Sequence, residues 1–328
     1  MTIRLSAAIE RFPIAGNFTI ARGSKTEAVV VAVRLEQDGH IGRGECVPYA
    51  RYGETPQSTL AAIEALVPAF AAGMSRLDLQ QALPPGAARN ALDCALWDLE
   101  AKRAGTSAAA LAGMTPPQHI ETAFTISLGS PDEMADAAAR AAHLPLLKIK
   151  LGTPGDAERL GAVRAAAPDT RLVVDANEGW HPDDLPVLLD ICAHCRVELV
   201  EQPLPAGADG ALVEINHTVP ICADESVHAL AGLEALVGRY EAINVKLDKT
   251  GGLTEALAVA ARAEALGLSI MVGCMVSTSL SMLPARLLAS RARWIDLDGP
   301  LLLEQDRPDG LVYERGMIAG GASPLWGG

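Results

Sequence analysis

Eight short apolar runs recur after residue 115, and amphipathic or Ala-rich segments separate them. The runs are HIETAFTIS (119–127), LLKIKLG (146–152), RLVVDAN (171–177), VELVEQP (197–203), PICADES (220–226), AINVKLD (242–248), LSIMVGCM (268–275) and RWIDLDG (293–299). Strands that alternate with helices indicate a parallel sheet, and eight such strands close a barrel. We therefore predict an α/β fold with a (β/α)8 TIM-like barrel over residues 116–299. A doubly wound open sheet would need a glycine-rich phosphate turn after its first strand, and that turn is missing.

The first 115 residues have a different pattern. The segment 28–49 contains two strands joined at Asp38-Gly39, and the start of the chain resembles an edge strand rather than a signal peptide. Helical periodicity follows over 56–70 and again over 87–103, where Gly105 provides a stop. We predict an α+β domain over 1–115 and a segment 300–328 that returns to complete it.

Length, charge and cysteine content limit the classes of function that the chain can have. A chain of 328 residues fits one barrel with an appendage, and no run of 18 apolar residues predicts a membrane span. The net charge of −13 argues against nucleic acid or an anionic membrane as partner. Six cysteines without an export signal suggest reduced thiols in a cytoplasmic protein. Whether the chain forms a homo-oligomer stays open at this level.

Cys192 and Cys195 form a C-x-x-C pair with two interpretations. The pair could be redox-active or half of a zinc site, but zinc needs about four ligands and no second pair has suitable spacing. The simpler interpretation is that both thiols pack at the end of a helix that begins near Asp184.

Polar residues collect where the predicted strands end. Lys150, Asp175, Glu201, Asp224 and Lys246 occupy successive strand ends, with spacings of 25, 26, 23 and 22 residues. Each spacing is one strand-plus-helix unit, so all five should converge at the carboxyl-terminal face of a barrel, where catalytic residues lie. Some strand-end polar residues, such as Asn177 and Ser226, could simply cap the following helix. Residues i and i+2 share a face, which pairs Lys148 with Lys150, Asp296 with Asp298 and Lys246 with Asp248.

These residue types point to proton transfer at carbon. Three carboxylates from adjacent strands (Asp175, Glu201, Asp224) suit Mg²⁺, which prefers oxygen ligands. A metal on a substrate carboxylate stabilises an enediolate, while a lysine on each face removes or returns the α-proton. Lys148 beside Lys150 should lower the pKa of Lys150 by charge repulsion. A Schiff-base lyase would not need three carboxylates, and a non-catalytic binding protein would not need two bases.

Several motifs match a known family. KIKLG (148–152), DANEGW (175–180), EQPLP (201–205), ADES (223–226) and VKLDKTGGLTEAL (245–257) resemble the muconate lactonizing enzyme subgroup of the enolase superfamily. ARGS (21–24), GECVPYARYGE (44–54), GAARNALDCALWDLEAKR (86–103), MVGCM (271–275) and DLDGP (296–300) resemble the dipeptide epimerases of the L-Ala-D/L-Glu type. The resemblance covers nearly the whole chain.

The resemblance implies an N-terminal domain that caps the barrel, Mg²⁺ on the three carboxylates, and Lys150 and Lys246 as acid/base catalysts assisted by Lys148. It implies epimerisation of a dipeptide such as L-Ala-L-Glu, as in peptidoglycan peptide recycling. The alternatives within the subgroup are an N-acylamino acid racemase, an o-succinylbenzoate synthase or a cycloisomerase.

The resemblance also implies a set of substrate contacts. Asp296 and Asp298 would hold the free ammonium of the dipeptide, although either could instead cap the Gly299-Pro300 turn. Thr125 would contact the substrate, and Cys274 would either do so or be a buried apolar residue. Arg22 matches an arginine that pairs with a glutamate side chain, with an exposed loop residue as the alternative. Arg51 and Lys25 are further candidates for that pairing.

Overall fold

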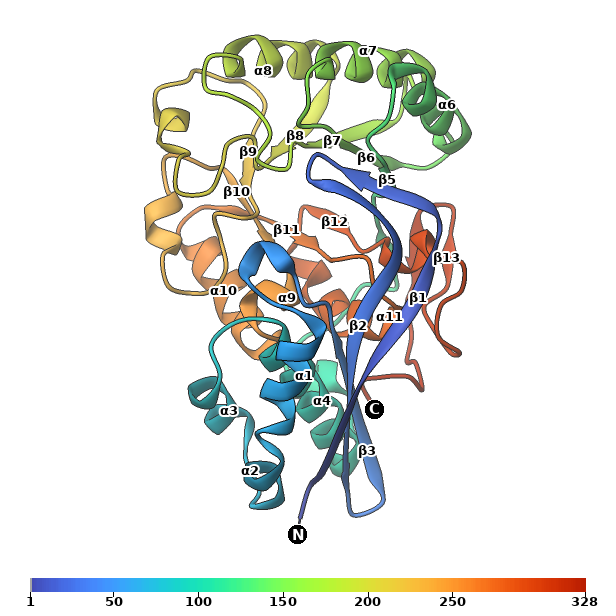
Figure 1. The fold of residues 1–328 in the computed structure, drawn as a ribbon, viewed down its shortest axis with the longest axis vertical. Coiled ribbons are helices and arrows are strands. Elements are labelled where there is room, and N and C mark those ends of the chain that lie inside the picture. Colours follow the sequence, from blue (N-terminus) through green and yellow to red (C-terminus); the bar gives the residue numbers. More distant parts are fainter. Residues whose placement is uncertain (1) are drawn as a thin grey trace.

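The computed structural model, which describes residues 2–328, contains a parallel barrel (Figure 1). Its eight strands are β5 (Phe124–Ile126), β6 (Leu146–Lys150), β7 (Arg171–Asp175), β8 (Val197–Glu201), β9 (Ile221–Ala223), β10 (Ala242–Val245), β11 (Ser269–Gly273) and β12 (Trp294–Asp296). Each strand is paired with its neighbours in the sequence, in one sheet. The two ends of that sheet are joined by the hydrogen bond from Ala123 N to Ile295 O (2.8 Å). The predicted barrel is confirmed.

An apolar layer fills one level of the barrel. It takes one residue from each strand or its first flank: Ala123, Leu146, Val173, Leu199, Cys222, Ala242, Met271 and Trp294. All eight are at most 2% exposed and form a cluster separate from the main core under the outer helices. Because side chains two residues apart share a face, the next inward-facing level begins two residues further along every strand.

The outer helices cover most of the barrel. They are α6 (Pro131–Ala141), α7 (Asp156–Ala166), α8 (Leu185–His194), α9 (Leu247–Thr250), α10 (Leu253–Ala265) and α11 (Ser279–Ala285), which continues as the 3-10 helix η4 (Arg286–Arg291). The connections after β8 and β9 differ from the predicted alternation, because they carry only the 3-10 helices η2 (Gly210–Val213) and η3 (Leu233–Leu236). Pro205, Gly207 and Pro220 interrupt the first of these connections, and such residues disfavour a longer helix.

The N-terminal region is an antiparallel sheet packed on helices. The sheet contains β1 (Arg4–Ile20), β2 (Gly23–Gln37) and β3 (His40–Cys46), in that order, with β1 at an edge as predicted. The helices are η1 (Ala50–Tyr52), α1 (Pro56–Glu64), α2 (Val67–Ala71), α3 (Arg76–Ala82), α4 (Ala87–Ala104) and α5 (Ala108–Leu111). At Gly44 a Cβ would lie 2.0 Å from Ala91 O, so only glycine lets β3 approach α4 this closely.

The β1–β2 hairpin extends beyond the other N-terminal elements until its tip lies beside the barrel strands (Figure 1). Its turn is formed by Ala21 and Arg22, between the paired residues Ile20 and Gly23. The hairpin thereby brings residues from the start of the chain to the barrel opening.

The C-terminal segment contacts both regions. After η5 (Gly299–Leu302), strands β13 (Tyr313–Glu314) and β14 (Met317–Ala319) form a small antiparallel sheet with β4 (His119–Glu121). Glu304 N donates to Pro13 O (2.9 Å) in β1, and Gly327 N donates to Asp98 Oδ1 (2.7 Å) in α4. Because the segment contacts both regions, the boundaries proposed from the sequence (1–115, 116–299, 300–328) stay predictions.

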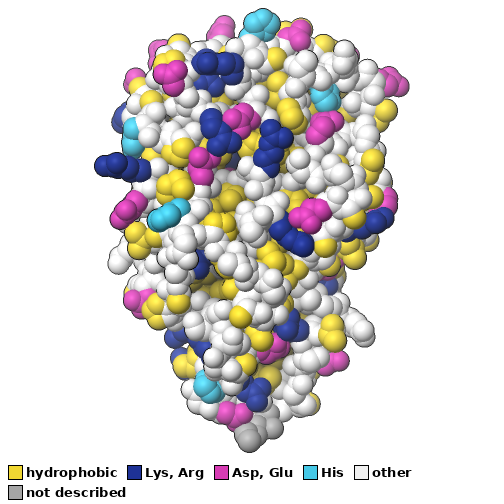
Figure 2. Space-filling model, turned by 180° about the vertical axis from the view of Figure 1, so that it is seen from behind, with side chains coloured by type: hydrophobic (Ala, Val, Ile, Leu, Met, Phe, Trp, Pro, Cys, Tyr) yellow, Lys and Arg dark blue, Asp and Glu magenta, His cyan; other side chains and the backbone are white. Residues whose placement is uncertain are grey.

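Surface charge is mixed on the face opposite the view of Figure 1. Figure 2 shows acidic and basic side chains interspersed there, several of them side by side. Within residues 2–328, no helix is both long and apolar enough to cross a membrane.

Candidate active site

A polar layer lies two residues beyond the apolar layer along the barrel strands. It consists of Thr125, Lys148, Asp175, Glu201, Asp224, Asn244, Gly273 and Asp296. One pleat further come Lys150 at the end of β6 and, just beyond the ends of β7, β10 and β12, Asn177, Lys246 and Asp298. The pleat of parallel strands therefore brings the sequence-predicted residues together at one end of the barrel.

Lys148 lies at the centre of this layer and is fully buried. Its Nζ is 2.6 Å from Glu201 Oε2, 2.7 Å from Asp296 Oδ2 and 3.4 Å from Asp175 Oδ2. Burial opposes the charge on Lys148, but the carboxylates outweigh it and raise the pKa of Lys148 well above its usual value. This raised pKa favours the charged form of Lys148, and its predicted effect on Lys150 by charge repulsion stays a prediction.

The two predicted catalytic lysines pair with different carboxylates. Lys150 Nζ is 2.6 Å from Asp175 Oδ2, and Lys246 Nζ is 2.6 Å from Asp224 Oδ2. Burial opposes the charge on Lys246, but Asp224 and Glu201 raise its pKa well above the usual range. Both lysines line one cavity of about 770 Å³ between the barrel and the N-terminal region. A single bound molecule can thus contact both.

The three carboxylates predicted to bind metal are buried and form part of this lysine network. Among residues 2–328, no three acidic, histidine or cysteine side chains already have the close grouping of a metal site, because lysine ammonium groups lie between these carboxylates. Burial opposes ionisation of all three, yet the lysines hold the pKa values of Asp175 and Asp224 below normal. Burial and Asp175 raise the pKa of Glu201.

The donor set fits a hard divalent cation. All three side chains offer oxygen, the ligand atom that Mg²⁺ prefers. Glu201 Oε2 is buried and accepts no hydrogen bond, although Lys148 Nζ contacts it as an ion pair. This oxygen already lies against one cation, the Lys148 ammonium, and the residues present are compatible with Mg²⁺.

Two supporting residues were not found from the sequence. Lys249 is 1% exposed, and its Nζ contacts both Asp224 Oδ1 (2.5 Å) and the Asp224 carbonyl oxygen (2.5 Å). Asn244 Nδ2 donates to Glu201 Oε1 (2.7 Å). The i, i+2 rule applied backwards from Lys246 would have found Asn244. Lys249 gave no such indication, because it lies in the short helix α9 rather than on a strand.

The prediction that Asp248 shares a face with Lys246 is wrong. Strand β10 ends at Val245 and α9 begins at Leu247, so strand alternation stops before Asp248. The Asp248 carboxylate instead accepts hydrogen bonds from Val47 N (3.0 Å) and Asn90 Nδ2 (2.8 Å) of the N-terminal region. Burial raises the pKa of Asp248 to about 7.

Asp296 and Asp298 line the cavity together with Thr125 and Cys274. Asp298 Oδ2 accepts a hydrogen bond from Thr125 N (2.7 Å), and the Asp298 side chain makes no capping bond to η5. Asp296 Oδ1 is buried without a hydrogen-bond partner. Burial and the neighbouring Asp296 raise the pKa of Asp298 to about 7. This pair therefore offers unfilled acceptor capacity to a cationic group.

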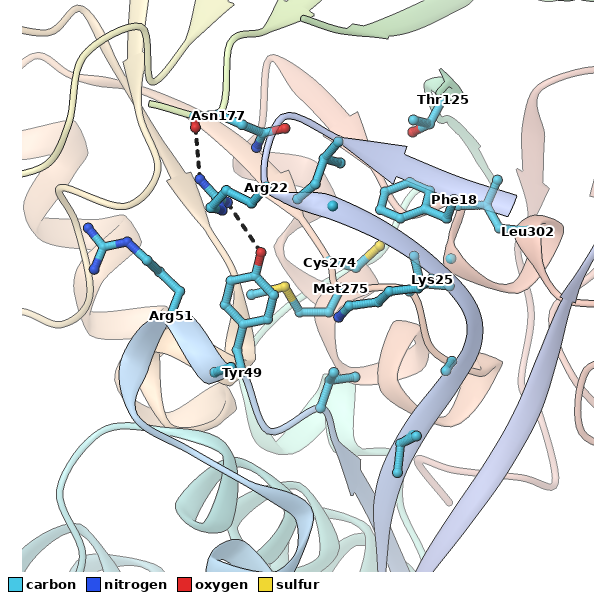
Figure 3. A pocket seen from close by; sticks show the side chains of 18 of the residues that line it. Phe18, Arg22, Lys25, Tyr49, Arg51, Thr125, Asn177, Cys274, Met275 and Leu302 are labelled. Carbon is cyan, nitrogen blue, oxygen red and sulfur yellow. Dashed lines mark hydrogen bonds between the residues drawn. The ribbon is translucent and has the colours of Figure 1, made fainter. Parts of the chain in front are cut away.

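Arg22, at the hairpin tip, reaches across to the barrel (Figure 3). Its guanidinium donates to Asn177 O (2.8 Å), Tyr49 Oη (3.2 Å) and Glu225 Oε1 (2.7 Å). A fourth contact joins Arg22 Nη1 to Glu178 Oε2 (3.3 Å). Arg22 thus lines the cavity as predicted, with its hydrogen-bonding groups largely occupied by the protein.

Cys192 and Cys195 lie outside the cavity. Both thiols are free and buried at the end of α8, and Asp184 precedes that helix as predicted. Burial raises the pKa of Cys192 to about 12, which disfavours a reactive thiolate.

The chain is similar to known protein families and to individual proteins. Residues 133–324 match the family described as enolase C-terminal domain-like. Residues 3–113 match the mandelate racemase / muconate lactonizing enzyme N-terminal domain. The L-Ala-D/L-Glu epimerase of Escherichia coli (strain K12) is 49% identical over 94% of this chain and 97% of its own length. The N-acetyl-D-glutamate racemase of a Pseudoalteromonas species is 43% identical over 91% and 95%.

Solved structures agree with the sequence relatives. An enolase family member from Agrobacterium tumefaciens, with bound sodium and L-Ala-L-Glu, is 54% identical with a TM-score of 0.97, covering 99% of this chain and 100% of its own. A dipeptide epimerase from Cytophaga hutchinsonii, complexed with Mg and D-Ala-L-Val, is 28% identical with a TM-score of 0.93, covering 100% and 96%. The chain therefore belongs to the mandelate racemase/muconate lactonizing enzyme family of the enolase superfamily.

Proposed function

We propose that this protein is a Mg²⁺-dependent dipeptide epimerase that interconverts L-Ala-L-Glu and L-Ala-D-Glu by 1,1-proton transfer. One observation carries the proposal. Lys150 and Lys246 come from strands on either side of the three carboxylates, line the same cavity, and pair with different members of that trio. Two bases around one binding position are what inversion at a carbon requires. The relatives that act on or bind dipeptides support this choice.

The proposed proton transfer uses both lysines in turn. A neutral lysine on one face takes the α-proton of the second residue, and the charged lysine on the other face delivers a proton to the same carbon. Lys150 and Lys246 exchange these roles in the reverse direction. After one turnover each lysine has changed protonation state, and solvent exchange restores it.

Asp175, Glu201 and Asp224 would hold Mg²⁺. When bound, the metal would neutralise the negative charge that develops on the substrate carboxylate during deprotonation. Lys148 contacts two of these carboxylates, Asp175 and Glu201, as a buried cation. Burial opposes ionisation of Asp175, but Lys150 and Lys148 outweigh it and lower the pKa of Asp175.

Asp296 and Asp298 would bind the free ammonium of the dipeptide. Lys148 holds Asp296 through Oδ2 and Thr125 N holds Asp298, while Asp296 Oδ1 lacks a hydrogen bond and is left to accept one. Thr125 and Cys274 line this part of the cavity as further substrate contacts.

An N-acylamino acid racemase is the second candidate. The 43%-identical N-acetyl-D-glutamate racemase favours it. Lys148 also neutralises part of the charge of Asp296, which weakens the demand for a cationic substrate. The two candidates share the lysines and carboxylates, and differ only in whether the substrate carries an ammonium group.

Deuterium incorporation tests both candidates. The purified protein with Mg²⁺ in D₂O is incubated with a dipeptide library and with N-acetyl amino acids, and mass spectrometry follows the substrates. Gain of one deuterium confined to Ala-Glu-like dipeptides is the expected result. Exchange in N-acetylglutamate but in no dipeptide would establish the second candidate, and turnover of only a cycloisomerase substrate would exclude both.

A cytoplasmic location, a homo-oligomeric state and a part in peptidoglycan recycling stay predictions. The six free cysteines among residues 2–328 are compatible with the first of these.

A further inference from the structure

The backbone holds Lys150 and Lys246 in different ways. Lys150 is the last residue of β6 and pairs with Asp175 of β7 within the ladder of parallel strands. Lys246 lies one residue beyond the end of β10 and directly precedes the one-turn helix α9. Its carbonyl oxygen accepts hydrogen bonds from Lys249 N and Thr250 N (both 3.0 Å) of that helix. The backbone position of Lys246 therefore depends on α9 as well as on the strand.

The helix α9 has only four residues and is not stable by itself, because forming a first helical turn is unfavourable. Contacts from other elements must hold it. Helix α4 packs against α9 and α10 where the N-terminal region meets the barrel (Figure 1). Within residues 2–328, every hydrogen bond between an α4 side chain and the barrel involves residues 248–255. The N-terminal region thus contacts the segment that follows Lys246.

Arg89 and Asn90 of α4 hold the two ends of α9. Asn90 Nδ2 donates to Asp248 Oδ1 (2.8 Å) in the first turn. The Arg89 guanidinium donates to Thr250 O (2.7 Å) and Gly251 O (3.2 Å) at the carboxyl-terminal end, where helix carbonyls lack partners within the helix. Arg89 is only 3% exposed, and a Cβ on Gly251 would lie 2.4 Å from its Nε. Glycine is therefore needed for this close approach.

Asp93 of α4 fixes the start of α10, which follows α9 after Gly251 and Gly252. Gly252 precedes α10 and has no side chain that could cap the helix. The fully buried Asp93 takes this role, because Thr254 N donates to its Oδ2 (2.9 Å) and Thr254 Oγ1 to its Oδ1 (2.6 Å). Trp97 Nε1, one turn further along α4, also donates to Thr254 Oγ1 (2.9 Å). One face of α4 thus holds both α9 and α10.

We infer that helix α4 is a positioning element for Lys246 and not for Lys150. Arg89, Asn90 and Asp93 hold α9, and α9 fixes the backbone from which the Lys246 side chain extends. The inference rests on the proposed epimerase function, in which each lysine serves one face of the α-carbon. Reacting groups must be held within about 0.5 Å of the productive geometry, so a loosened α9 impairs one of the two proton transfers and leaves the other intact.

Exchange of the α-proton for deuterium, followed for each epimer at saturating Mg²⁺ and dipeptide, tests the inference. Lys246→Ala identifies the epimer whose α-proton Lys246 removes, because this variant no longer exchanges it. Asp93→Asn should lower the exchange rate of that epimer by up to about 10²-fold, the cost of displacing a reacting group by 1 Å. The exchange rate of the other epimer should stay near the wild-type value.

Asp98→Asn is the matched control on the same helix. Asp98 is as buried as Asp93, but it accepts hydrogen bonds from Arg43 N (2.8 Å) and Gly327 N (2.7 Å), which lie outside the barrel. This variant should leave both exchange rates unchanged, whereas Arg89→Met should reproduce the asymmetry of Asp93→Asn. Equal losses for both epimers in Asp93→Asn, or no loss in either Asp93→Asn or Arg89→Met, would overturn the inference.

Amide hydrogen exchange, read by NMR, distinguishes failure of this inference from failure of the proposed function. Asp93→Asn should speed the exchange of the Thr250 and Gly251 amides, which donate within α9, relative to that of the Leu151 amide beside Lys150. Unchanged protection of both α9 amides would reject the role of α4 in an active epimerase. If the wild-type protein exchanges the α-proton of no dipeptide, the epimerase proposal fails, whereas the amide comparison still decides whether α4 holds α9.

Discussion

The barrel opening and the β1–β2 hairpin both present charged groups to one cavity, but they hold them differently. In the barrel, Lys148, Asp175 and Glu201 are fully buried and neutralise one another across adjacent strands. On the hairpin, the Arg22 side chain is 28% exposed and depends on acceptors from other elements. Strand pleating fixes the first set, whereas docking of the N-terminal region fixes the second. Substitutions in the hairpin should therefore change which substrate is preferred, while the rate of proton transfer should change little.

The largest effect is expected for the two lysines of the barrel. Lys150→Ala and Lys246→Ala should each lower the epimerisation rate by roughly 10²–10⁴-fold, the usual contribution of a positioned acid or base. Polarimetry or chiral chromatography of the dipeptide measures the rate. Normal epimerisation by either variant would show that the barrel lysines do not carry the chemistry.

Removing a barrel carboxylate should weaken Mg²⁺ binding more than it lowers the stability of the fold. Glu201→Gln should weaken Mg²⁺ binding by at least about tenfold, because even residues that only orient a ligand cost this much. Isothermal titration with Mg²⁺ alone gives the affinity without any turnover. Asn244→Ala, which removes the donor to Glu201 Oε1, is the graded control and should have a smaller effect. Equal Mg²⁺ affinity in wild type and Glu201→Gln would reject the proposed ligand set.

Asp298 should make dipeptide binding depend on pH. Burial and Asp296 raise its pKa to about 7, so protonation below that pH removes a charge that the substrate ammonium needs. KM for the dipeptide should rise as pH falls below 7, by at most about tenfold per unit for one proton. Asp298→Asn should remove this dependence, and N-acetylglutamate should not show it. A KM that is constant between pH 5 and pH 7 would contradict the assignment.

The smallest effect concerns the contact between the two regions. Asp248 has a pKa of about 7 in the folded protein, above its usual 3.8, so the folded state binds the extra proton. Its contribution therefore lowers stability as pH rises from about 4 to about 7. Asp248→Asn keeps an acceptor for Val47 N and should be the more stable protein at pH 8 by roughly 1 kcal/mol. Thermal unfolding against pH measures this, and parallel curves for the two proteins would refute it.

Much of the barrel could be predicted from the sequence because its strands are short, apolar and evenly spaced. The pleat then fixed which residues share a face, and Lys148, Lys150, Asp175, Glu201 and Asp224 lie together at one end of the barrel. The same reasoning failed at Asp248, because a one-turn helix begins directly after β10 and the Asp248 carboxylate bonds to Val47 and Asn90 of the N-terminal region.

Other features required the tertiary structure. Lys249 reaches Asp224 from α9, and no periodicity marks that position. Glu225 forms an ion pair with Arg22, and Glu178 forms one with Arg51. These ion pairs exist only because the N-terminal region folds over the barrel. Sequence spacing can place a charge at a strand end, but it cannot show which charges the protein already neutralises.

Stereospecific deuterium exchange tests the two-base account most directly. L-Ala-L-Glu and L-Ala-D-Glu are incubated separately in D₂O with Mg²⁺ and each lysine variant, and α-deuterium is followed by NMR. If each lysine serves one face, Lys150→Ala should retain exchange with one epimer only, and Lys246→Ala should retain exchange with the other only. Exchange of both epimers by one variant, together with none by the other, would show that a single lysine does the work and would contradict the account.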